Sequence, residues 1–491
     1  MSFAESTLTL SRALWLLSPE LLLLSFAVLI LILDVALKDK RWVPYVTMVG
    51  LFAALIAAAT QWGIQEQVFF VLSLDNFSVV VKLIALMAMI IVVLISEDYM
   101  QVHTEEPALF HALLLFSTIS ICLLGASTNL LMIFLVFDFL SIVSYILTAY
   151  VCCNLVANEA AFKYFMYGST LSAVMLYGFS WLYGLTGVTD LSTIAQGLFV
   201  IQQRGIPSIW FTPLLILIVA GLSYKVAAAP FHQWAPDAYE GAPTPVAAFF
   251  SVAPKIAGFA LFVRVTEVLF PVALELGVEW RWPLLAFISA FAMTFGNLAA
   301  LAQENVKRLM AYSSIAQAGY VLIGVTMASE RGVTAVLLYL LAYALTNLGA
   351  FAVIIAYENR TGARNIADYA GAYQRAPFSA LVMTVCLLSL AGIPGTAGFM
   401  GKLWLFAAAV EGNMVWLAAL GVLNSIISLA YYWKIIRAMY IAPSWTEEPV
   451  RPSPLLYTAL GLTLGGVLLV GIFPSIVLPW FQSATQTFFG G

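Results

Sequence analysis

The chain has 491 residues, of which 63% are hydrophobic and only 9% are charged. Soluble domains carry about 25% charged residues, so this composition excludes a soluble protein and makes the lipid bilayer the natural solvent. The apolar segments are too long and too unalternating for an outer-membrane barrel, which predicts an all-α integral membrane protein. The net charge of −4 is uninformative about partners, and no basic run suggests nucleic acid as one.

Apolar segments long enough to be transmembrane helices recur along the whole chain, and we predict 14 of them. They cover 20–37, 43–61, 77–96, 108–124, 128–150, 160–184, 209–229, 244–270, 282–301, 305–328, 332–357, 377–410, 413–440 and 455–480. The first is expected to be a retained span, because the N-terminus lacks the pattern of a cleaved signal peptide. The segment 189–203 is too short and polar to span and is expected at the membrane interface.

Two of these segments contain an interruption. The seventh runs into Pro230 and continues as the short polar stretch Phe231–Tyr239, and the twelfth is broken around Pro394 by the sequence GIPG. Unwound backbone inside a membrane is tolerated where it lines a cavity or is buried in protein. Interrupted helices in two separate halves of a transporter indicate its pathway.

The distribution of Lys and Arg predicts that both termini lie outside the cytoplasm, in agreement with the positive-inside rule. With that orientation the inner side receives Lys38, Lys40, Arg41, Lys163, Lys307, Arg308, Arg360, Arg364, Arg375, Lys434, Arg437 and Arg451. The outer side receives Arg12, Arg204, Arg281 and Arg331, with Arg264 near the outer end of a helix.

Four lysines remain inside apolar segments: Lys82, Lys225, Lys255 and Lys402. A lysine at the centre of a transmembrane helix costs about 2.5–3.5 kcal/mol, so such residues face a protein interior or a hydrated cavity. Desolvation favours the neutral amine and a nearby carboxylate favours the charged one, so moving a carboxylate loads or unloads a proton. We predict that Lys225, Lys255 and Lys402 mark a pathway for protons or cations. Lys82 either belongs to this pathway or has a snorkelling or structural role with Asp75.

Other polar residues extend this candidate pathway. Asp138 lies in the middle of an apolar segment, where it serves the pathway or a polar contact between helices. Glu159 and Lys163 are four residues apart, a spacing that brings them together on one helix face, in the pathway or as an ordinary ion pair. His232 follows Pro230 and is either part of the pathway or an interfacial histidine.

Cofactor-binding patterns are missing from the sequence. Cys122, Cys152, Cys153 and Cys386 form no CxxC or Cys/His metal pattern, so no metal site, iron–sulfur cluster or haem is expected on this chain. No GxGxxG dinucleotide motif is expected either, because no strand is predicted to carry one.

Four motifs resemble the antiporter-like membrane subunits of respiratory complex I. The segment from Lys225 to Lys255, KVAAAPFHQWAPDAYEGAPTPVAAFFSVAPK, is similar to the signature of the subunit N and subunit 2 type. Further similarity lies in EAAFKYF (159–165), NVKRLMAYSSIAQAGY (305–320) and AGIPGTAGFMGK (391–402).

The resemblance implies two inverted five-helix repeats with equivalent interrupted helices 7 and 12. It divides the chain into helices 1–3 (1–107), a first repeat of helices 4–8 (108–270), a second repeat of helices 9–13 (271–440) and helix 14 (441–491). The family's pathway residues correspond to Asp138, Lys225, Lys255 and Lys402. Their implied roles are a carboxylate that tunes Lys225, an inner gated lysine, a central relay and an outward exit. The family usually has glutamate where this chain has Asp138, so the pairing distance is expected to be longer or bridged by water.

The resemblance further implies that the chain is a subunit of a proton-translocating NADH-quinone oxidoreductase in a bacterial inner membrane. Other membrane subunits would be its partners, and NADH, FMN, iron–sulfur clusters and quinone would bind those partners. A multi-subunit cation/proton antiporter or a membrane-bound hydrogenase is the alternative, because such relatives share the fold and the lysines. A standalone transporter of an organic solute would need a polar pocket that the sequence does not reveal.

Overall fold

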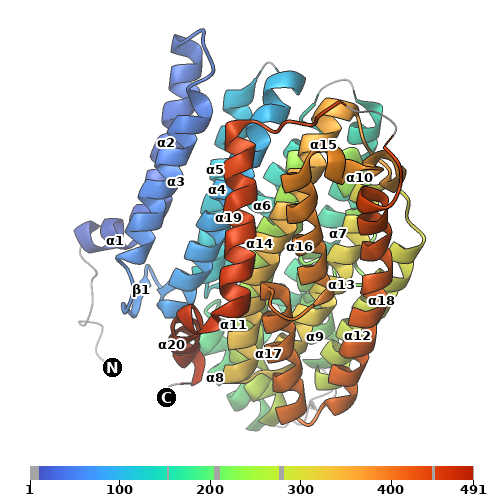
Figure 1. Cartoon of the computed structure of the whole chain (residues 1–491). Helices are drawn as coiled ribbons and strands as arrows, with labels where there is room; N and C mark the ends of the chain where they lie inside the picture. The colour runs from blue at the N-terminus through green and yellow to red at the C-terminus, as the bar shows by residue number, and fades with distance from the viewer. Residues whose placement is uncertain are drawn as a thin grey trace.

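The computed structural model describes residues 10–104, 106–151, 154–203, 211–275, 281–444 and 448–489, and these are almost entirely helical. Long helices run roughly side by side in one bundle, with an N-terminal helical pair beside it (Figure 1). The elements are α1 (Leu10–Leu16), α2 (Ser18–Ala36), α3 (Val43–Ala59), β1 (Glu66–Val68), β2 (Leu72–Leu74), α4 (Asn76–His103), α5 (Pro107–Ala126), α6 (Leu130–Thr148), α7 (Leu155–Thr186), α8 (Leu191–Gln203), α9 (Phe211–Lys225), α10 (Trp234–Gly241), α11 (Thr244–Glu275), α12 (Arg281–Leu301), α13 (Val306–Met327), α14 (Glu330–Thr361), α15 (Ala372–Arg375), α16 (Pro377–Ala391), α17 (Ala397–Glu411), α18 (Val415–Tyr440), α19 (Pro454–Ile472) and α20 (Leu478–Phe489).

Every predicted span coincides with an observed helix or, at 377–410, with the broken pair α16 and α17. Ten helices in the described part of the chain are long and apolar enough to cross a membrane, and α3, α9 and α16 are shorter apolar helices. The prediction of an all-helical membrane protein is therefore confirmed, while the number of 14 crossings stays a prediction.

Two predicted boundaries are wrong. The third span was expected to end at 96, but α4 continues to His103, so the polar residues from Glu97 onward are helical. The last span was expected to reach 480, but α19 ends at Ile472 and a separate helix, α20, follows. Pro474 explains this end, because a proline disfavours helical backbone in the residue before it and lacks an N–H group.

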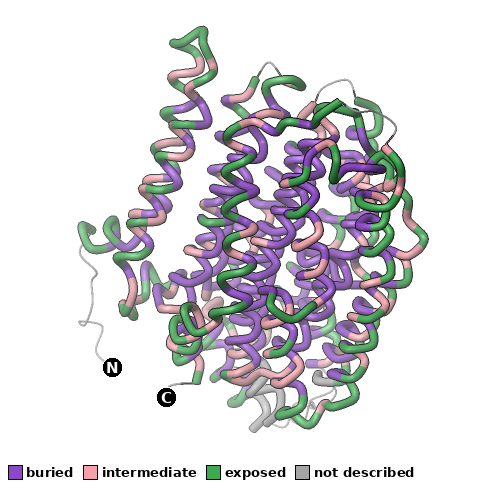
Figure 2. Tube along the Cα trace, viewed as in Figure 1, coloured by how far each residue is buried: buried purple, intermediate pink, exposed green. Residues whose placement is uncertain are grey.

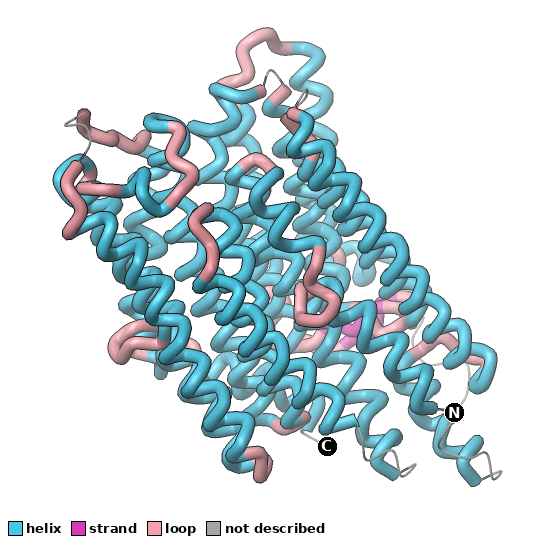
Figure 3. The backbone as a smooth tube through the Cα atoms, turned by 90° about the vertical axis from the view of Figure 1, so that its right-hand side faces the viewer, coloured by secondary structure: helices cyan, strands magenta, loops and turns pink. Residues whose placement is uncertain are grey.

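The expectation that no strands are present is also wrong. β1 and β2 form a two-stranded antiparallel hairpin between α3 and α4 (Figure 3). Polar residues in β1 and only three residues per strand give too weak an alternation to be recognised in the sequence. The hairpin sits at the end of the bundle where α4 begins.

The loops that carry the predicted inner basic residues meet at one end of the bundle. The backbone N–H of Val306 donates to the carbonyl of Arg364 (2.9 Å), and that of Val450 donates to the carbonyl of Arg375 (3.1 Å). At the opposite end, Thr128 bonds to the carbonyl of Val71 (3.1 Å). These contacts bring together loops that carry predicted inner basic residues, while the orientation of the termini stays a prediction.

The N-terminal pair α2–α3 is more exposed than the bundle, whose interior is continuously buried (Figure 2). An ion pair of 2.7 Å between Lys82 on α4 and Glu20 on α2 joins the pair to the bundle. Both side chains are almost completely buried. The expectation that Lys82 contacts Asp75 is wrong, because Glu20 occupies the position next to the ammonium group.

Candidate functional site

The first helix interruption lies between α9 and α10, within the height of the bundle, and Lys225 is the last residue before it. The described backbone leaves the helix at 226, and Pro230 cannot donate a hydrogen bond within the break. The carbonyl of Tyr224 accepts the backbone N–H of Ala227 (3.0 Å) and the indole N–H of Trp234 (3.1 Å), so the indole takes the place of the i+4 donor that the break removes. Loop segments inside the bundle, away from its ends, are visible in Figure 3.

Lys225 is 1% exposed and points toward α6. Its Nζ donates to Ser141 Oγ (2.7 Å) and to the carbonyl of Phe137 (3.4 Å), and it lies 4.6 Å from the centroid of the Phe137 ring. These contacts hold a buried amine through one hydroxyl, one carbonyl and one aromatic face. No carboxylate of the described residues forms an ion pair with it.

Asp138 lies on α6 between the two residues that Lys225 contacts, yet it pairs with a different group. Ser172 on α7 donates a hydrogen bond to its carboxylate. The expected partners Lys225 and Lys163 form no ion pair with Asp138 in the described chain. Lys225 therefore contacts α6 on either side of Asp138 along the chain, at Phe137 and Ser141, but forms no ion pair with its carboxylate. This agrees with the longer pairing distance expected for a side chain one methylene shorter than glutamate.

Glu159 and Lys163 form the expected contact on α7, at 2.8 Å. Lys163 also pairs with Asp237 on α10 (2.9 Å). Arg308 on α13 pairs with Asp237 (2.9 Å) and with Glu240 (2.8 Å). These partly exposed charges join α10, the helix that follows the first break, to α7 and α13.

His232 lies in the turn between α9 and α10 and is 8% exposed. Its ring centroid is 4.6 Å from that of Phe295, and its Nδ1 has no hydrogen-bond partner among the described residues. The structure thus places His232 near the break but does not bring it into contact with Lys225, Lys255 or Lys402.

Lys255 and Lys402 are linked by a series of polar groups. Lys255 on α11 donates to the backbone carbonyl of Ser314 on α13. One residue earlier, the hydroxyls of Ser313 and Tyr432 on α18 are 2.5 Å apart. Gln317 contacts Tyr432 (3.3 Å) and donates to the carbonyl of Leu390 (3.2 Å).

Lys402 donates to that same carbonyl of Leu390 at 2.8 Å, and it is 3% exposed. It also donates to the carbonyl of Ala391 (3.2 Å) and to Ser425 Oγ (3.0 Å), and it lies 4.2 Å from the centroid of the Tyr320 ring. The two carbonyls belong to the last residues of α16, where the break removes their helical partners. Lys402, which belongs to α17, therefore caps the C-terminal end of α16.

Gly392 makes this approach possible. It has φ of +88°, a conformation in which a side chain is strained, and a Cβ atom there would stand 3.0 Å from Cδ of Lys402. We expect Gly392→Ala to lower the free energy of unfolding by about 1–2 kcal/mol and to displace Lys402. Gly465→Ala is the matched control, since its Cβ would meet no atom within 4 Å. Equal thermal melting midpoints for both variants would contradict this role of Gly392.

A polar cavity of about 420 Å³ opens at the predicted inner end, beside the start of α11. Lys307 lines it, although it is only 7% exposed, and it pairs with Glu358 at 3.8 Å. Thr244 donates to Glu358, and Glu240, which also lines the cavity, adjoins Tyr239. The Tyr239 hydroxyl is 2.9 Å from Ser314 Oγ, so the residue before Glu240 contacts the residue whose carbonyl Lys255 bonds.

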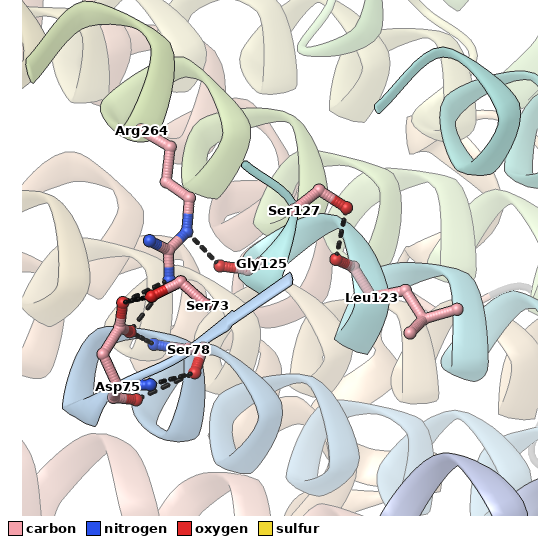
Figure 4. Close-up of polar contacts among 7 residues, drawn as sticks. All are labelled: Ser73, Asp75, Ser78, Leu123, Gly125, Ser127 and Arg264. Atoms are coloured by element: carbon pink, nitrogen blue, oxygen red, sulfur yellow. Dashed lines mark hydrogen bonds and ion pairs between the residues drawn. The ribbon is translucent and has the colours of Figure 1, made fainter. Parts of the chain in front are cut away.

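Asp75 pairs with a residue that the sequence pattern did not indicate. Arg264 on α11, which is 3% exposed, pairs with this carboxylate at 2.8 Å, and its Nε donates to the carbonyl of Gly125 (2.5 Å), as Figure 4 shows. Asp75 also caps α4 by accepting from the N–H of Ser78 (2.7 Å). The feature of the sequence that could have indicated this pair is Arg264 itself, a charged residue inside an apolar segment.

Cys122 and Cys386 are free and buried, whereas Cys152 and Cys153 lie outside the described residues. Among the described residues, no group of three or more His, Cys, Asp or Glu side chains is arranged to hold a metal ion.

Known proteins resemble this chain over almost its whole length. The profile of a family described as "NADH:quinone oxidoreductase/Mrp antiporter, TM" matches residues 127–428. NADH-quinone oxidoreductase subunit N of Trichlorobacter lovleyi is 40% identical over 474 residues, which cover 95% of this chain and 96% of the relative.

Two solved structures share the architecture. A chain of respiratory complex I from Thermus thermophilus superposes with a TM-score of 0.78 at 30% identity, covering 95% of this chain and 100% of the other. A chain of the Mrp complex from a Dietzia species has a TM-score of 0.83 at 22% identity, with 98% of each chain covered, and shows the same fold. The chain therefore belongs to the NADH:quinone oxidoreductase/Mrp antiporter family of integral membrane subunits, within the subunit N and subunit 2 type.

Proposed function

We propose that this chain is a proton-translocating membrane subunit of an NADH-quinone oxidoreductase that couples quinone reduction in partner subunits to proton transfer. The observation that carries the proposal is the set of three buried lysines, two of them at helix breaks. Gln317 and Tyr432 connect the surroundings of Lys255 with the Leu390 carbonyl that Lys402 bonds. Buried lysines in a membrane interior are costly and are retained for ion pathways. The family, described as NADH:quinone oxidoreductase/Mrp antiporter, agrees with this proposal.

In this proposal the residues act in the order in which they lie across the bundle. Lys225 is the gated inner element, held by α6 and tuned by Asp138. Lys255 is the central relay, and the cavity beside Lys307 supports access to it from the inner end. Lys402 is the outward exit, and its ammonium group connects the helix-end carbonyls of α16 with Ser425 on α18. Glu159, Lys163 and His232 serve this pathway by positioning the first break and the short helix after it.

Between Lys225 and Lys255, the proposal needs water or a side-chain movement. Lys225 packs against Gly258 on α11, three residues beyond Lys255, and a Cβ atom at Gly258 would stand 3.4 Å from Cγ of Lys225. The described residues provide no direct hydrogen bond between these two lysines. A hydrated break after Lys225 supplies the space that such a connection requires.

We further propose that this chain holds no redox centre and that NADH, FMN, iron–sulfur clusters and quinone bind partner subunits. It would lie in a bacterial inner membrane with 14 crossings and both termini outside the cytoplasm. The proposed division is 1–107, a repeat at 108–270, an inverted repeat at 271–440 and a final helix within 441–491. One interruption in each proposed repeat, at Pro230 and at Pro394, supports this division, although Lys225 precedes its proline whereas Lys402 follows its own.

A cation/proton antiporter subunit is the second candidate, favoured by the fold shared with the Mrp complex. Co-purification separates the two proposals. Recovery of the chain with quinone reductase activity supports the first. Recovery with sodium-antiport subunits and no quinone reductase activity would reject it.

We predict that Asp138→Glu is tolerated, because it lengthens a carboxylate that already reaches Ser172 and brings it toward Lys225. Asp138→Asn is expected to lower proton pumping about fivefold, corresponding to about 1 kcal/mol, since the amide keeps the contact with Ser172 but loses the charge. Pumping by reconstituted complex in vesicles, measured with a pH-sensitive dye, tests both. An Asp138→Glu variant that pumps as poorly as Asp138→Asn would remove Asp138 from the pathway.

A further inference from the structure

A small polar cavity of about 210 Å³ lies where α4, α14 and the start of α19 meet, away from the lysine pathway. Its lining includes Arg360 from the last turn of α14 and Arg451 from the segment that leads into α19. That segment crosses the end of the bundle that carries the inner loops (Figure 1). The cavity therefore lies at the predicted inner membrane surface.

Both arginines are exposed, and neither guanidinium forms a hydrogen bond or ion pair with the described residues. Asp98 is the acidic residue of the lining, and its carboxylate accepts the backbone N–H of Ser453 (3.3 Å). Two arginines and one aspartate thus line one cavity. One carboxylate cannot balance two guanidinium groups, so the lining carries a net positive charge that attracts an anion.

The chemistry of the cavity favours a phosphate group. The planar guanidinium fork matches phosphate oxygens in a bidentate manner. The 19-residue helix α19 begins at Pro454, two residues after the lining residue Pro452, and the positive end of its dipole adds to the attraction for an anion. Gln101 and Asn359 complete the lining with groups that can hydrogen-bond to a headgroup.

The surface below the cavity favours a lipid as the source of that phosphate. Along α19, Tyr457, Leu462 and Leu469 are 42%, 51% and 49% exposed, so an apolar helix face runs from the cavity toward the bilayer centre. The cytoplasmic leaflet is rich in anionic lipids, and basic pockets between helices on that side bind their headgroups. We propose that Arg360 and Arg451 bind the phosphate of an anionic phospholipid of the inner leaflet, whose acyl chains lie along α19.

The test uses the assembled complex in nanodiscs of phosphatidylcholine with phosphatidylglycerol as the probe. Lipid retained after mild delipidation is counted by native mass spectrometry for the wild type, Arg360→Gln, Arg451→Gln and the double variant. Each single substitution is expected to lower phosphatidylglycerol retention about fivefold, with a larger loss in the double variant. Arg437→Gln is the matched control, since Arg437 is an exposed inner arginine outside the cavity, and it should retain the lipid.

Other outcomes would overturn the proposal. Equal retention by the wild type and the double variant would exclude a lipid site. Binding of inorganic phosphate without retention of phosphatidylglycerol would assign the cavity to a free anion. Loss of a neighbouring subunit with lipid retention unchanged would assign it to a protein partner. Arg451→Lys, which keeps the charge, guards against misfolding, because it should retain more phosphatidylglycerol than Arg451→Gln.

Discussion

Lys402→Ala is expected to lower the rate of proton transfer through this subunit about 100-fold, the contribution typical of a positioned acid–base group. Alanine removes the ammonium group that connects the carbonyls of Leu390 and Ala391 with Ser425 on α18. Lys225→Ala should have a similar effect, because it removes the amine that faces Ser141 across the first break. Both variants should assemble, since alanine leaves only hydroxyls and carbonyls to be hydrated.

The measurement compares dye-reported proton uptake with NADH oxidation in the same vesicles. Lys434→Ala is the matched control, because Lys434 is an exposed lysine whose Nζ contacts only the carbonyl of Leu301 at the end of α12. It is expected to pump normally. Normal proton pumping in both Lys402→Ala and Lys225→Ala would remove these lysines from the pathway.

Arg264→Met is expected to have the largest effect on stability, a loss of about 3–5 kcal/mol in the free energy of unfolding. The substitution leaves the 2% exposed Asp75 as an unpaired buried charge, which is far costlier than the pair (Figure 4). It also removes the hydrogen bond to Gly125 and so loosens the contact of α11 with α4 and α5. Thermal melting of the purified complex and the amount of chain recovered in it measure the effect.

The double variant Asp75→Asn/Arg264→Met should recover most of the lost stability, because asparagine keeps the cap on α4 without leaving a buried charge. Arg331→Met is the control, since its ion pair with Glu411 has side chains 40% and 56% exposed and is expected to contribute less than about 1 kcal/mol. If Arg264→Met melts no lower than Arg331→Met, the buried pair does not stabilise this end of the bundle.

The sequence by itself determined the helices, the two interruptions and the three lysines. A span is recognisable because the bilayer requires a long apolar run, and Pro230 and Gly392 break helices by local backbone geometry. The three lysines are recognisable because the residues around them are apolar, and a charged side chain inside the bilayer costs free energy.

Only the tertiary structure decided which charges meet. Asp75 and Arg264 are 189 residues apart in the sequence, and Lys82 pairs with Glu20 rather than with Asp75, which is nearer in the sequence. Asp138 contacts Ser172 instead of a lysine, and Gln317 joins the surroundings of Lys255 to those of Lys402. Such partners depend on which helix faces pack together, and a uniformly apolar helix does not reveal in its sequence which face meets which neighbour.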